Sequence, residues 1–137
     1  MIIFVDTNVL LDVIGRRGAF HAPAALVWGL AEAGKVRGFV SAVSFNNVFY
    51  IVRRFAGAKR ALEAVRLVHA VFETAPVNGG IIAAAMESGI ADFEDAIQYH
   101  CALESGARYL VTRNRKDFPA RGPSLVAPEE FLGLMRA

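Results

Sequence analysis

The sequence predicts an α/β fold in which a central parallel sheet of four to five strands carries helices on both faces. Short apolar runs alternate with segments whose apolar residues recur at helical spacing, a pattern typical of a parallel sheet. The run Ile2–Val5 is apolar throughout, as expected of a strand buried on both faces. The chain has 137 residues and shows no internal repeat or linker, so we expect residues 1–137 to form a single domain.

Helices in the first half of the chain are recognised by their apolar periodicity and by the residues that end or cap them. Gly15 ends a short helical segment, and Gly34 follows a longer one as a C-cap residue. Ser44 has the side chain of a helix N-cap residue. After the first strand we therefore expect, in order, the helices Asn8–Ile14 and Phe20–Ala33, the strand Gly38–Ser41, and the helices Phe45–Phe55 and Ala58–Phe72.

The second half repeats the alternation of strands and helices. Asp92 is expected to cap a helix that runs through Leu103 and ends before Gly106. Pro128 fits the first turn of a final helix. The strands expected here are Thr74–Val77, Arg108–Thr112 and Leu125–Val126, and the other helices are Ile81–Met86 and Glu129–Met135.

Composition limits the classes of protein to which the chain can belong. The formal net charge of +2 and the dispersed basic pairs indicate a solvated surface that is compatible with a polyanionic partner. The single cysteine, Cys101, cannot form an intramolecular disulfide, which favours a reducing compartment. Asp6 and Asp12 interrupt the apolar N-terminus, which makes it a poor signal peptide. We expect a cytoplasmic protein without a membrane partner.

Three aspartates stand where a predicted strand or helix begins or ends: Asp6, Asp95 and Asp117. The carboxyl ends of parallel strands meet at one edge of a sheet, and ligands bind there. Carboxylates gathered at that edge repel one another unless a cation lies between them, so the arrangement predicts a divalent metal site and phosphodiester chemistry. From its own stretch, Asp6 could equally cap the helix that follows. Glu94 is expected to be a solvated surface acid.

The segment from Thr112 to Phe118 combines polar residues with three cations directly after a strand. As a plain loop it would be unremarkable. At the edge of a phosphate-binding cleft, its carboxylate would hold a metal while Arg113, Arg115 and Lys116 bind the nucleic-acid backbone.

Taken together, four stretches resemble the PIN-domain family, which contains the VapC-type toxins of bacterial and archaeal toxin–antitoxin pairs. One such stretch alone is weak evidence, whereas all four in register are specific and cover nearly the whole chain. The stretches are Val5–Leu10, Ser41–Asn47, Asp92–Gln98 and Val111–Phe118.

The resemblance implies a Rossmann-like sandwich and a ribonuclease that depends on Mg²⁺ or Mn²⁺. The first family acid falls on Asp6 and the helix acid on Asp95. The last polar cluster falls on Asn114 and Asp117, of which we favour Asp117 as the acid. The resemblance also implies a toxin-like role, an antitoxin partner and a homodimer.

The chain departs from the family at Asn47, where many members carry a glutamate. An amide oxygen can ligate Mg²⁺ but brings no charge, so we expect weaker metal affinity unless Asp92 supplies the missing charge. We therefore expect Asp6, Asp95 and Asp117 to bind one or two ions with help from Asp92 and Asn47. Thr7 and Asn8 are expected to orient Asp6 or a metal-bound water.

Three alternative hypotheses remain open at this point. The fold could persist without chemistry, as a module that binds RNA or protein, and Asn47 is the feature that favours this reading. A receiver-like or phosphatase-like domain also places Asp at a strand end, but Asn8 replaces the second acid of the Asp-x-Asp pattern. Dimerisation through an apolar helix would accompany nuclease activity more than compete with it.

Overall fold

The core of the structure is a five-stranded parallel sheet with the strand order β3-β2-β1-β4-β5. The computed structural model describes residues 1–136. In the central register, Phe4 pairs with Phe39 on one side and with Leu110 on the other. The strands are β1 (Ile2–Val5), β2 (Arg37–Ser41), β3 (Glu73–Ala75), β4 (Tyr109–Val111) and β5 (Ser124–Val126). The predicted parallel α/β sheet is confirmed.

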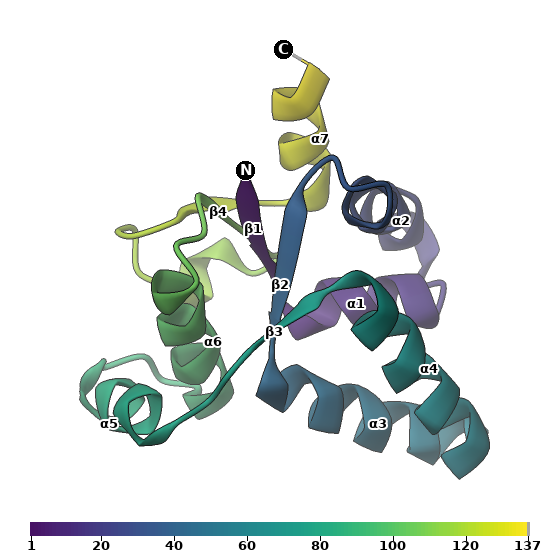
Figure 1. Ribbon diagram of the computed structural model, residues 1–137, viewed down its shortest axis with the longest axis horizontal. Helices are drawn as coiled ribbons and strands as arrows, with labels where there is room; N and C mark the ends of the chain where they lie inside the picture. The colour runs from purple at the N-terminus through teal and green to yellow at the C-terminus, as the bar shows by residue number, and fades with distance from the viewer. Residues whose placement is uncertain (137) are drawn as a thin grey trace.

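Helices cover both faces of this sheet, as the sequence predicts. Figure 1 shows α5 and α6 on one side of the strands and α1 to α4 on the other. The helices are α1 (Thr7–Ile14), α2 (Gly18–Glu32), α3 (Ala42–Ala56), α4 (Ala58–Val71), α5 (Gly79–Glu87), α6 (Phe93–Glu104) and α7 (Pro128–Arg136), with a 3-10 turn η1 at Arg115–Asp117. Among residues 1–136, no helix combines the length and the apolar content that crossing a membrane requires.

The alternation of side chains along β1 divides the hydrophobic core in two. Successive residues of a strand point to opposite faces. Ile3 and Val5 accordingly pack in the core under α1 to α4 and α7, whereas Phe4 packs in the core under α5 and α6. All three side chains are essentially inaccessible to solvent, so β1 is fixed from both faces and the residue that follows it has a well-defined position.

The starts of α3 and α5 differ from the prediction because other residues cap these helices. Ser44 does not cap α3; Ser41 does, because its side chain accepts a hydrogen bond of 3.1 Å from the backbone N–H of Val43. The strand β2 runs into α3 without an intervening loop, so the last strand residue serves as the cap. Asn78 caps α5 and extends that helix by two residues before Ile81. The predicted Asp92 cap is confirmed.

Candidate metal centre

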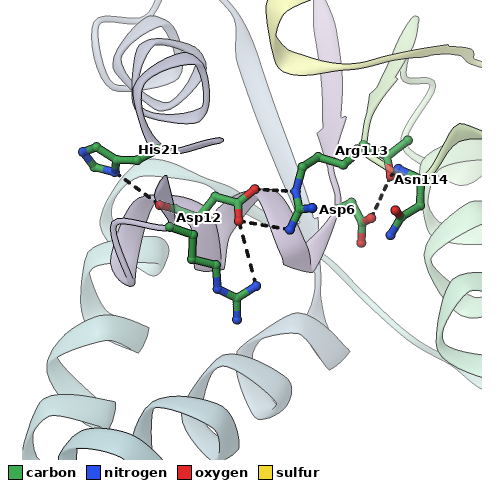
Figure 2. Close-up of polar contacts among 7 residues, drawn as sticks. Asp6, Asp12, His21, Arg113 and Asn114 are labelled. Carbon is green, nitrogen blue, oxygen red and sulfur yellow. Dashed lines mark hydrogen bonds and ion pairs between the residues drawn. The ribbon is translucent and has the colours of Figure 1, made fainter. Parts of the chain in front are cut away.

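Asp6 is the first residue after β1, and its side chain is held by the loop that follows β4. The Thr112 hydroxyl donates a hydrogen bond of 2.8 Å to Asp6 Oδ2, and the backbone N–H of Asn114 donates to Thr112 Oγ1 at 3.0 Å (Figure 2). Asp6 is only 2% exposed. Its backbone occupies the N-cap position of α1, but its side chain makes no capping hydrogen bond. The Asp6 carboxylate is therefore oriented toward the loop after β4 and does not cap α1.

Gln98 is a polar residue of the site that sequence reasoning missed. Its Oε1 accepts a hydrogen bond of 3.3 Å from the backbone N–H of Thr7, and its side chain is fully buried. The Nε2 of Gln98 has no hydrogen-bond partner among the described residues. A polar side chain three positions after Asp95, within an apolar helical stretch, was the available signal. The Thr7 hydroxyl in turn shares a hydrogen bond of 2.7 Å with that of Ser44, which explains the burial of both.

The surroundings of Asp6 act on its charge in opposite directions. Burial raises the pKa of the Asp6 carboxyl, while the Thr112 hydroxyl, the Gln98 amide and the backbone N–H groups at the start of α1 favour its charged form. The Gln98 amide N–H₂ group makes no hydrogen bond to the Asp6 carboxylate, but it lies close enough to lower the pKa of that carboxyl. A buried carboxylate with this much preformed support is suited to holding a cation.

Three acids meet at the start of α6. Asp92 caps the helix by accepting a hydrogen bond of 3.0 Å from the backbone N–H of Asp95. Asp92, Glu94 and Asp95 each place a carboxylate oxygen within 4.8 Å of the others. Glu94 is half-buried rather than solvated, so the expectation that it is a surface acid was wrong.

The charges at this centre come from three distant segments of the chain. The pKa of Asp95 is raised to about 7 by burial first, and then by the charges of Asp92, Asp6, Asp117 and Glu94. The pKa of Glu94 is likewise raised to about 7 by burial and by Asp6 and Asp92. The end of β1, the start of α6 and the turn η1 therefore bring their acids into mutual electrostatic contact. A divalent cation would relieve this repulsion, and carboxylate oxygens are the ligands that Mg²⁺ and Mn²⁺ prefer.

An open hollow of about 480 Å³ lies beside these acids and is lined by Asp92, Asp95, Lys116 and Asp117. Asp6 is not among the residues that line it. Another hollow, of about 350 Å³, lies beside Arg37 and Cys101 and is lined by a single acid, Glu104. That second hollow lacks the carboxylate set that a hard cation requires, so the first is the candidate centre.

The remaining predicted site residues are distributed unevenly around this hollow. The guanidinium of Arg113 is bound to Asp12, and that of Arg115 forms an exposed ion pair of 2.8 Å with Glu130. Figure 2 draws the side chain of Asn114 beside the Asp6 carboxylate. Asn8 and Asn47 are half-buried and do not line the hollow. Among the three predicted cations, Lys116 is the one that borders the acids.

Comparison with known proteins gives one family and several relatives. A family model described as "PIN domain" matches residues 3–116. The chain is 26% identical over 134 residues to "Ribonuclease VapC1" of Aquifex aeolicus (strain VF5), a match that covers 94% of this chain and 92% of the relative. The family match includes Asp6, Asp92 and Asp95 and stops one residue before Asp117.

Several solved structures have a similar fold. The VapBC-1 structure from nontypeable Haemophilus influenzae superposes with a TM-score of 0.70 at 18% identity and covers 94% of this chain and 99% of that one. A toxin–antitoxin complex from Klebsiella pneumoniae gives a TM-score of 0.67 at 23% identity, with 91% and 96% of the two chains covered. At these identities the similarity establishes the fold.

Proposed function

Because the chain belongs to the PIN-domain family, we propose that it is a metal-dependent ribonuclease that hydrolyses phosphodiester bonds in RNA. One observation carries this proposal: Asp92, Asp95 and Asp117 line one hollow, and burial together with the charges of Asp92, Asp6, Asp117 and Glu94 raises the pKa of Asp95 to about 7. Such a set of charges is costly without a cation and useful with one. The name of the Aquifex aeolicus relative, a ribonuclease, supports the same reaction.

In this proposal the carboxylates hold one or two Mg²⁺ or Mn²⁺ ions. Asp6, Asp95 and Asp117 are the ligands, and Asp92 and Glu94 add the charge that Asn47 does not bring. A bound ion lowers the pKa of a coordinated water and polarises the scissile phosphate. Thr112 keeps the Asp6 carboxylate in place through its 2.8 Å hydrogen bond, as residues around a metal ligand commonly do.

Binding of the RNA backbone falls to the cations that remain accessible. Lys116 borders the hollow and Arg115 lies exposed in the same turn, so both can neutralise phosphates that flank the reacting one. Arg113 is removed from this set, because its guanidinium already binds a buried carboxylate.

The proposed partners are taken from the proteins whose structures are similar to this chain. The similar structures include VapBC and other toxin–antitoxin complexes, which supports a toxin-like role with an antitoxin as partner. The proposal also includes a homodimer, on the resemblance to the family alone. A cytoplasmic location, where Mg²⁺ is abundant and Cys101 stays reduced, fits this role.

Removal of the metal should abolish the reaction. We expect a fluorescently labelled RNA to be cleaved in the presence of Mn²⁺ or Mg²⁺, to remain intact in EDTA, and to be cleaved again when Mn²⁺ is added in excess. The reason is that the carboxylates alone supply no electrophile for the phosphate. Cleavage that continues at full rate in EDTA, with contaminating nuclease excluded by the Asp6→Asn variant, would contradict the proposal.

A glutamate at position 47 should strengthen metal binding. If Asn47 lies near the ion, Asn47→Glu adds a charged ligand, and we expect the Kd for Mn²⁺ measured by calorimetry to fall roughly tenfold. The matched control is Asn46→Glu, which adds the same charge at the exposed neighbouring position and should change the Kd much less. Equal affinities in both variants would mean that position 47 does not reach the ion.

A further inference from the structure

Arg113 and Asp12 form a partly buried ion pair that the proposed reaction does not use. Arg113 Nε donates to Asp12 Oδ2 at 2.7 Å and its Nη2 donates to Oδ1 at 3.2 Å, so the contact is bidentate (Figure 2). The Asp12 side chain is fully inaccessible to solvent, and Arg17 Nη1 lies 3.9 Å from its Oδ1. The planar fork of an arginine held in this way is fixed in direction as well as in distance.

The other surface of the guanidinium is fixed as well. The central carbon of the Arg113 guanidinium lies 4.0 Å from the centre of the Phe20 ring, at the start of α2. His21, the next residue of α2, places its Nδ1 at 3.2 Å from the backbone oxygen of Asp12. Arg113 is therefore held at its edge by α1 and at its face by α2, so its guanidinium is already engaged by the protein.

Arg113 lies in the same loop as Thr112 and Asp117, so its contacts with α1 and α2 also hold that loop. Thr112, the residue before it, binds Asp6 at the start of α1, and Arg113 binds Asp12 at the far end of the same helix. The N–H of Asn114 then donates to Thr112, and that of Asp117 donates at 3.0 Å to the Asn114 carbonyl. The loop that carries Asp117 is thus tied to α1 at two successive residues.

We propose that the Asp12–Arg113 pair is a positioning device that fixes the loop 112–117 relative to Asp6 and thereby sets Asp117 for the metal. The inference rests on the proposed function for its metal and on the contacts above for its geometry. A buried ion pair is weak as a source of net stability, since apolar residues of similar volume often replace one without loss. Two opposite charges with bidentate geometry at this point therefore point to positional control.

The decisive variant removes both charges together. We expect Asp12→Val/Arg113→Met to fold with a midpoint of urea unfolding near that of the wild type, because neither charge is left buried alone. Its Kd for Mn²⁺, measured by calorimetry, should nevertheless rise about 10-fold or more, the usual consequence of losing an outer-shell support. Hydrogen exchange of the amides of Asn114 and Asp117 should become at least about tenfold faster, since the loop opens locally.

A matched control removes a pair of the same chemistry elsewhere. Arg37 and Glu73 form a bidentate contact of 2.9 and 2.8 Å at the opposite, exposed part of the sheet. Arg37→Met/Glu73→Val should leave both the Kd and the exchange of Asn114 and Asp117 unchanged. Wild-type Kd and wild-type loop exchange in the Asp12/Arg113 double variant would overturn the inference, as would faster exchange with an unchanged Kd.

Two further arms keep the result decisive. If the double variant does not fold, Asp12→Asn keeps the size of the side chain while removing its charge, and wild-type loop exchange in that variant would overturn the inference. If the wild-type protein binds no Mn²⁺, the proposed metal site fails, and hydrogen exchange alone then decides whether the pair holds the loop. Failure of the metal site and failure of the clamp are thus distinguishable.

Discussion

The Asp95→Asn variant is expected to lose RNA cleavage while its metal-free form gains stability. Cleavage should fall by at least about 100-fold, because loss of a direct ligand exceeds the 10–100-fold effects seen for outer-shell residues. The stability gain has a separate origin. Burial and four neighbouring carboxylates raise the pKa of Asp95 to about 7. Above that pH the ionised carboxylate destabilises the folded state through desolvation and repulsion, and a neutral amide removes both costs.

Two measurements establish the opposite signs of these effects. Single-turnover cleavage of labelled RNA with saturating Mn²⁺ reports the loss of activity, and urea unfolding at pH 8 in EDTA reports the gain in the free energy of unfolding. The control is Glu63→Gln on the exposed face of α4, which removes one acid far from the centre and should change neither quantity. If Asp95→Asn cleaves at the wild-type rate, Asp95 is not a ligand.

The sequence was sufficient for the parts of the site that local pattern controls. Asp6 directly follows an apolar run that is typical of a buried strand, and the residue after such a strand is expected at the carboxyl edge of the sheet. Asp92 and Asp95 stand at the start of a helix with a recognisable cap. Their meeting could be inferred because topology, rather than side-chain packing, brings strand ends and helix starts together.

The parts that depend on packing could not be inferred in the same way. The loop sequence predicts that Arg113 binds RNA at the edge of a phosphate-binding cleft, whereas its actual partner, Asp12, lies 101 residues away in the sequence. Helical spacing alone places Glu94 on a different face of the helix from Asp95 and therefore predicts a solvated surface acid. Gln98 gave only the weak signal of one amide on an apolar face. Each of these needs the position of a second element, which no local pattern contains.

The pH dependence of the metal-free protein is expected to follow from the same crowded acids. Glu94 and Asp95 have ordinary pKa values of 4.5 and 3.8, and in the folded protein both are raised to about 7. A carboxyl with a raised folded pKa binds its proton more tightly in the folded state. Its stabilising contribution is complete below about pH 4, and it is lost as the pH rises through about 7.

The free energy of unfolding in EDTA should therefore fall between pH 4 and pH 8. After a discount for partial exposure and for coupling between the two groups, the fall attributable to them is on the order of 2–4 kcal/mol. Urea unfolding of the wild type and of Glu94→Gln/Asp95→Asn isolates that part, because the remaining titratable groups are common to both proteins. The difference in stability between the two should grow with pH and level off above about pH 8.

Manganese should reverse this trend, which separates a metal site from a cluster of acids that is merely crowded. The ion binds the ionised carboxylates of the folded state and stabilises it by an amount that grows with the ratio of free ion to Kd. Because protons compete for the same oxygens, the Kd for Mn²⁺ falls as the pH rises. In 1 mM Mn²⁺, a concentration on the order of weak protein–metal Kd values, the free energy of unfolding of the wild type should therefore increase with pH. It should do so over the pH range in which that of the metal-free protein decreases. The Glu94→Gln/Asp95→Asn variant should show no such increase. A wild-type curve that declines equally with and without Mn²⁺ would mean that the acids gather at this edge of the sheet without holding an ion.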